Sequence, residues 1–276
     1  MVATNLAGAW EAPPFVIAGA ALAAILFTQA FVRLRRRGRT DLAGWDRPVL
    51  FGLGLAAIVL PLVSPLDEIG DDLLSAHMLQ HVLIGDLAPA LLVLAVRGPL
   101  CLFLLPPPVL RPLAGLRPLR AVLSFLLRPL VSLTVWAAII LGWHVPSAYD
   151  YVLAHPVIHD LEHVSFIFAG TLAWTQLVDP ARRQRLRAPG RILFGVAMIV
   201  LMHPVMDSML FSRSALYPAY ADRADRLWGI SPLTDQRLAG AIMIVEQLLT
   251  VGTCIGVLLW PYLKRRRESK LAHEGA

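Results

Sequence analysis

The stretch "LLSAHMLQHVLIGDLAPALLVLAV" (residues 73–96) indicates both the fold and the chemistry of this chain. As a helix, at about 1.5 Å per residue, it is long enough to cross the roughly 30 Å hydrocarbon layer of a membrane. It carries His77 and His81, which stand one helical turn apart and so share a face of the helix. A second pair at the same spacing lies in "HDLEHVSF" (159–166). Ionisable groups are costly inside a membrane segment, so such pairs point to a function.

The composition of the whole chain supports a membrane protein. Hydrophobic residues make up 57% of the 276 residues and charged residues 16%, with a mean hydropathy of +0.64. Soluble domains carry about a quarter charged residues. We therefore predict an all-α, polytopic membrane protein that forms a single domain over residues 1–276. Cys101 and Cys254 are far apart in sequence and suggest neither a disulfide framework nor a thiolate metal site.

Seven segments are predicted to cross the membrane as one helical bundle. Each is predominantly apolar and roughly 20 residues long, as a membrane helix requires. The second is short and contains Gly52, Gly54 and Pro61. The predicted spans are 14–32, 48–64, 73–96, 129–146, 157–178, 191–211 and 237–262, followed by a basic tail at 263–276.

The arginines and lysines give the predicted orientation. In a seven-span chain they gather on one side, whereas the opposite loops are poor in them and "PLDEIGDD" (65–72) is acidic. By the positive-inside rule, the N-terminus faces outwards and the C-terminus lies in the cytoplasm. The same clustering argues against a nucleic-acid partner despite the net charge of +6 and favours contacts with the lipid bilayer. The basic segments are 33–47, 97–128, 182–191 and 264–270.

Six of the eight histidines fall in predicted spans, all of them in the outer half of the bilayer. Two pairs on two helices at the same depth could supply four nitrogen ligands to one ion, and a carboxylate could orient an imidazole. His155 is expected in an outer loop and His273 in the tail. The candidate metal ligands are His77, His81, His144, His159, His163 and His203. The candidate supporting residues are Met78, Glu162, Met202, Met206 and Asp207.

These residue types narrow the choice of ion. Imidazole suits zinc, copper, iron and nickel, whereas a methionine thioether adds a preference for Cu(I). Copper is the predicted ion, with zinc or haem as alternatives. For the methionines, the alternative is core packing, and for a single histidine it is a structural hydrogen bond between helices.

Four separated motifs resemble those of a known family. They are "HMLQHVLIGDLAPALLVLAVRGPL", "WHVPSAYDYVLAHPVIHDLEHVSFIFAGTLAW", "ALYPAYADR" and "PLTDQRLAGAIM". Their order resembles that of the CtaG-type cytochrome c oxidase assembly factors, which accompany bacterial caa3-like oxidases, from about residue 45 to 262. The resemblance implies a seven-span protein and singles out His77 and His81, His144 in a WHxP motif, His159 and His163, and Asp235 and Gln236 in a DQ motif.

The resemblance also implies a function. We expect the protein to help mature a haem-copper oxidase in the bacterial cytoplasmic membrane, supplying copper to an oxidase subunit from the outer side and without catalytic turnover. The residues alone leave open a haem-binding electron carrier, a transporter using Asp86, Asp207 and Glu246, and a zinc hydrolase in which Glu162 activates water. Neither histidine pair has the HExxH pattern of metalloproteases. A homo-oligomer also remains open.

Overall fold

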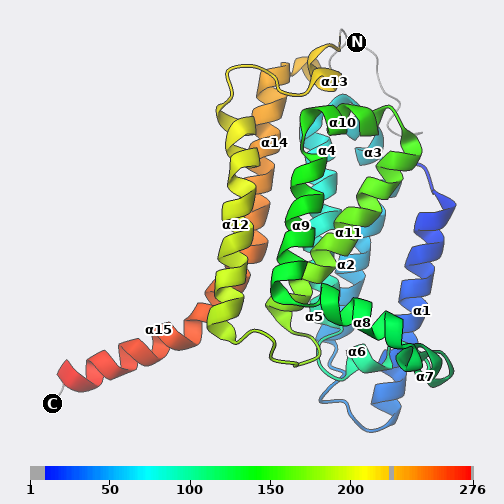
Figure 1. Ribbon diagram of the computed structural model, residues 1–276, viewed down its shortest axis with the longest axis vertical. Coiled ribbons are helices and arrows are strands. Elements are labelled where there is room, and N and C mark those ends of the chain that lie inside the picture. Colours follow the sequence, from blue (N-terminus) through cyan, green and yellow to red (C-terminus); the bar gives the residue numbers. More distant parts are fainter. Residues whose placement is uncertain (1–9, 224–226, 275–276) are drawn as a thin grey trace.

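A computed structural model describes residues 10–223 and 227–274, and this described part is helical with no strand. Long helices lie side by side in a bundle, with short helices at both of its ends (Figure 1). The separate long helices are α1 (Pro14–Arg36), α2 (Asp46–Val63), α9 (Pro129–Trp143), α11 (Pro156–Val178) and α12 (Ala188–Phe211). Two further rods are composite: α4 (Leu74–Val82), η1 (Leu83–Leu87) and α5 (Ala88–Ala95), and α14 (Pro232–Gln247), η3 (Leu248–Gly252) and α15 (Thr253–Glu274).

Five of the described helices are long and apolar enough to cross a membrane, and a sixth is added if a bent pair counts as one span. The bent pair joins α8 (Arg117–Leu126) to α9 at 75°. The predicted span 157–178 corresponds to α11, which is not one of these five. This helix has 23 residues, but its beginning is polar and contains Asp160 and Glu162. The described part of the chain is therefore all-helical and multi-pass, as predicted, with five to six candidate spans by length and composition where the sequence predicted seven.

The short helices divide between the two ends of the bundle (Figure 1). One end, which we call the α10 end, holds α3 (Leu66–Asp72), α10 (Pro146–Leu153) and α13 (Pro218–Ala221). The opposite end, the α8 end, holds α6 (Leu100–Phe103), α7 (Pro107–Gly115) and α8. A short 3-10 helix, η2, covers Leu227–Gly229.

Arginine-rich segments meet at the α8 end. The Arg47 guanidinium donates to the carbonyl of Arg97 at 2.7 Å, and Arg97 in turn pairs with Asp46 at 2.7 Å. The Gly98 amide donates to the carbonyl of Pro180 at 2.6 Å, which ties the segment after α5 to the segment after α11. Basic segments that are distant in sequence thus share one end of the bundle, as the predicted topology requires.

Each composite rod contains a π-helical segment, and the two segments meet in the core. The Thr250 hydroxyl in η3 donates to the Asp86 carboxylate in η1 at 2.7 Å. The Trp174 indole N–H of α11 donates to the other Asp86 oxygen. Because π segments hold an extra residue and often occur at functional sites, this contact marks the part of the bundle where function is expected.

Helix α11 packs against η1 at backbone distance. A Cβ atom placed on Gly170 would lie 1.9 Å from the carbonyl oxygen of Gly85 and 2.9 Å from Pro89 Cγ. Only a residue without a side chain allows this approach. The contact sets the spacing between α11 and the α4–α5 rod, which carry the two histidine pairs.

Candidate metal centre

The first histidine pair is positioned by a carboxylate that caps helix α4. The backbone N–H groups of Leu74 and Ser75 donate to the two oxygens of Asp235 at 2.8 and 3.0 Å. A carboxylate at a helix N-terminus satisfies free N–H groups and complements the helix dipole. Asp235 is fully buried. The capped turn leads directly into His77, so the Asp of the DQ motif acts through the backbone of α4.

The neighbouring Gln236 fixes the loop that covers the site. Its side-chain oxygen accepts from the Leu216 amide at 2.6 Å, and its amide donates to the carbonyl of Met209 at 3.2 Å. The loop thus held carries Tyr217 and Tyr220 to the α10 end of the bundle. The DQ motif, noticed in the sequence without a role, is structural.

The second pair opens helix α11. Pro156 occupies the first position of the helix, where its missing N–H costs nothing. His159 and His163 follow in the first two turns and face α4.

The four histidines converge on one point. Ring centroids are 4.2 Å apart for His77 and His81 and 4.3 Å apart for His159 and His163. Across the two helices, His77 lies 5.1 Å from His159, and His81 lies 5.3 Å from His163. One nitrogen from each ring falls within 4.8 Å of the other three. The prediction that the two pairs come together is confirmed.

These imidazoles present nitrogen lone pairs that nothing in the described chain satisfies. The Nε2 atoms of all four rings are buried and, within residues 10–223 and 227–274, have no hydrogen-bond partner. A buried polar group left unpaired costs roughly 1–3 kcal/mol. Four such atoms at one point fit a set of metal ligands better than a packed core.

Tyr220 sets the tautomer of His77. Its hydroxyl donates to the Gly70 carbonyl at 2.8 Å, so its oxygen accepts the Nδ1–H of His77 at 3.2 Å. Burial raises the pKa of the Tyr220 phenol well above its usual value, which keeps this hydrogen in place. With Nδ1 protonated, Nε2 of His77 carries the free lone pair. Sequence reasoning missed this role, although "ALYPAYADR" was noted as a motif.

A buried carboxylate stands beside the histidines. Glu162 is 1% exposed, and one of its oxygens lies 3.8 Å from Nε2 of His81. Neither Glu162 oxygen has a hydrogen-bond partner among the described residues. Since an isolated buried charge is strongly unfavourable, a cation held by the four imidazoles would provide the compensation that this carboxylate lacks.

The geometry is close to what one ion requires. Two nitrogens bound to the same ion at about 2.1 Å can lie at most about 4.2 Å apart. The observed limit of 4.8 Å exceeds this by less than 1 Å. Small ring movements would therefore bring His77, His81, His159 and His163 onto one ion.

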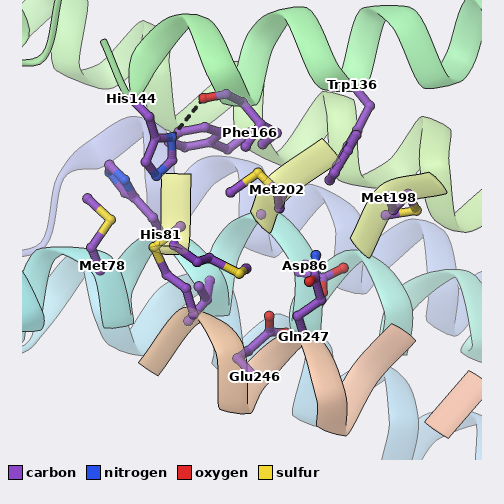
Figure 2. A pocket seen from close by; sticks show the side chains of 15 residues that line it. Met78, His81, Asp86, Trp136, His144, Phe166, Met198, Met202, Glu246 and Gln247 are labelled. Carbon is purple, nitrogen blue, oxygen red and sulfur yellow. Dashed lines mark hydrogen bonds between the residues drawn. The ribbon is translucent and has the colours of Figure 1, made fainter. Parts of the chain in front are cut away.

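His144 lies on the other side of His81. Its ring stands 6.3 Å from Phe166, and its Nδ1–H donates to the Ile140 carbonyl at 2.7 Å. Together with His81, it lines a cavity of about 60 Å³ that also contains Met78, Met202 and Met206 (Figure 2). This places His144 and the three predicted methionines beside the cluster.

His203 and Asp207 occupy other positions. His203 is exposed on α12, and its Nδ1–H donates to the Ile199 carbonyl of the same helix at 3.1 Å. It is not among the histidines that converge. Asp207 is half-buried and likewise outside the cluster. The structure thus brings four of the six candidate histidines together, places His144 nearby and leaves His203 outside.

A second cavity reaches the cluster from the opposite side. It measures about 300 Å³, lies between α1, α2 and α11, and is lined by His159, His163 and Asp67. Asp67 belongs to the acidic helix α3, and burial raises the pKa of its carboxyl group. The histidine cluster therefore lies between two cavities, one beside His81 and one beside His159.

Comparison with known proteins identifies the family of the chain. The family described as cytochrome c oxidase caa3 assembly factor matches residues 25–265, which cover most of the chain and both histidine pairs. Neither curated proteins nor solved structures give a significant match. Because the family match covers most of its length, the chain belongs to the caa3-type cytochrome c oxidase assembly factors.

Proposed function

We propose that this assembly factor holds a copper ion in the four-histidine cluster and donates it to an oxidase subunit. One observation carries the proposal: each of four histidine rings offers a nitrogen within 4.8 Å of the other three. The Nε2 atoms of these rings are buried and unpaired within the described chain, as is the carboxylate of the neighbouring Glu162. The family supplies the context, because an oxidase assembly factor implies an oxidase partner in the same membrane.

Several features favour copper over the alternatives. Copper binds nitrogen ligands more tightly than zinc in the Irving–Williams order, and methionines adjoin His81 in the neighbouring cavity. Haem needs its macrocycle between two axial ligands, whereas the facing rings of His77 and His159 are only 5.1 Å apart. The role of an assembly factor requires binding and release, with no catalytic turnover.

Electrostatics favours entry of a cation from the α10 end. Helix α3 and the segment before α1 present acidic residues around a cavity of about 380 Å³, lined by Glu11, Asp67, Glu68 and Asp71. Clefts lined by one sign of charge raise the local concentration of oppositely charged ions. Asp67 lines this cavity and also the one that reaches His159, so the acidic rim leads towards the histidines.

Metal analysis of the purified full-length protein tests the proposal. We expect the four histidines to hold about one copper ion per chain. This ion should be lost when His159 and His163 are replaced together by alanine. Leucine at the exposed Val157 in the same helix is the control and should leave copper binding intact. Uptake of zinc with no binding of Cu(I) under reducing conditions would contradict the copper assignment.

We further propose seven spans, with the N-terminus outside and the C-terminus in the cytoplasm, so that the cluster lies near the outer face. The proposal rests on the arginine-rich segments that meet at the α8 end. Reporter fusions at residue 38 and residue 153 are expected to score cytoplasmic and external, respectively. The reverse pattern would place the histidines at the cytoplasmic face and exclude copper entry from outside.

A further inference from the structure

Five of the seven methionines of the chain line the one small cavity beside the histidine cluster. We propose that this cavity, here called the methionine pocket, is a second metal site that takes Cu(I) or another soft monovalent cation. The inference deepens the proposed function and rests on it for the choice of copper. The methionines of the pocket are Met78, Met198, Met202, Met206 and Met243.

The thioethers come from three helices. Met198, Met202 and Met206 recur every fourth residue on one face of α12 and are 1%, 4% and 3% exposed. Met78 from α4 and Met243 from α14 complete the wall. Figure 2 shows Met202 in the middle of the pocket, with His81 and His144 on one side and Met198 on the other. Thioether sulfur is a soft ligand that selects Cu(I) over harder ions.

The lining of the pocket offers little to a hydrated ion. Most of the side chains around its volume of about 60 Å³ are apolar or carry a thioether sulfur, so few of them can hydrogen-bond to the water shell of an ion. An ion that enters must exchange its water for protein ligands. Cu(I), which accepts few and soft ligands, suits such a space better than a strongly hydrated divalent ion.

Methionines alone would be read as core packing, but the imidazole of His144 points to a ligand. The side chain is 8% exposed, and its Nδ1–H is used by the Ile140 carbonyl. Nε2 therefore carries a lone pair, and it has no partner among the residues described. A pure packing role leaves this lone pair unpaired, whereas a cation among the thioethers would accept it.

An Asp86 carboxylate would place a negative charge at one end of the pocket. Asp86 accepts hydrogen bonds from Trp174 and from Thr250 and lines the pocket together with Glu246. Two donors on its two oxygens suit a carboxylate. A monovalent cation bound by neutral thioethers and His144 would be stabilised by this charge in the apolar interior.

His81 connects the two sites. It belongs to the four-histidine cluster and also lines the methionine pocket. Both of its ring nitrogens lack a hydrogen-bond partner within the described part of the chain. An ion can therefore exchange ligands at His81 and pass between cluster and pocket without returning to water.

Cu(I) titration of the full-length protein in detergent, with a competing Cu(I) chelator, tests the inference. We expect about two Cu(I) ions per chain for the unmodified protein. The variant M202L/M206L, which conserves side-chain volume, should lose one of them and keep the other. M209L is the matched control: Met209 is fully buried in the same core but does not line the pocket, so both ions should remain.

X-ray absorption gives a readout that needs no substitution in the pocket. Selenomethionine-labelled protein loaded with Cu(I) should show selenium–copper scattering. H77A/H159A, which disrupts the cluster and leaves the pocket intact, should keep this signal and one ion. If the labelled protein binds Cu(I) without selenium neighbours, the second site does not exist, although the histidine site can still stand. If the selenium signal persists but H77A/H159A removes no ion, the proposed function fails instead.

Discussion

Alanine in place of both His77 and His81 is expected to leave the host cell with oxidase polypeptide but almost no oxidase activity. The change removes two of the four converging imidazoles, and with His81 it removes the residue shared by the cluster and the methionine pocket. Four-ligand zinc sites in zinc-finger peptides bind their metal with roughly 10–16 kcal/mol. On that scale, the loss of two ligands should weaken binding by a factor on the order of 10³ or more. Respiratory oxidase activity in membranes, normalised to oxidase protein, measures the effect.

His203→Ala is the matched control for this experiment. His203 is also a histidine of a predicted span, yet it is exposed on α12 and bonds to its own helix. We expect oxidase activity close to normal in this variant. Equal loss in both variants, at equal levels of assembly factor in the membrane, would show that the convergence of the four rings is irrelevant to function.

Alanine in place of Gly170 is expected to prevent folding of the bundle around the site. Its Cβ would lie 1.9 Å from the Gly85 carbonyl oxygen, which is backbone and cannot rotate away. Helix α11 would have to move away from η1, separating His163 from His81. Overpacking of this kind costs about 3 kcal/mol or more. Thermal unfolding of detergent-solubilised protein, together with its yield in the membrane, measures the loss.

Gly19→Ala provides the comparison for Gly170. Gly19 lies within α1, and an added Cβ there meets nothing within 4 Å. Because alanine favours helix over glycine, the midpoint of unfolding should stay the same or rise slightly. An equal and large fall in both variants would mean that helix composition, and not the close approach of α11 to η1, determines stability here.

Much of the fold followed from simple regularities in the sequence. Long apolar segments predicted the helices, and the arginine-rich segments between them predicted loops that share one end. The spacing of four residues placed His77 with His81, and His159 with His163, on common helix faces. The two histidine pairs were also expected to come together in space, and the convergence of the four rings confirms that geometry.

The sequence predicted where His203 lies along its helix, but not which side of the helix it occupies. His203 is about 100° around the helix from Met202. Met202 and Met206 are buried in the core, whereas His203 is exposed on another side of α12. The sequence contained this conflict, because all three residues were candidates for one site.

The roles of Asp235 and Tyr220 could not be inferred from local sequence. Asp235 caps a helix that begins 161 positions earlier in the chain, and Tyr220 reaches His77 across 143 positions. No periodicity encodes such contacts, because they depend on how the finished bundle brings its ends together. The motifs containing these residues were visible, but their chemistry required the tertiary structure.

The π segments at 83–87 and 248–252 have a consequence for comparing relatives. A π segment holds one residue more than an α-helical turn, so that residue can be gained or lost without breaking the helix. In an alignment of this family, we expect single-residue gaps inside the spans to fall at these two places. Relatives lacking one segment should also differ at Asp86 and Thr250, because the changed winding would turn one side chain away from the other.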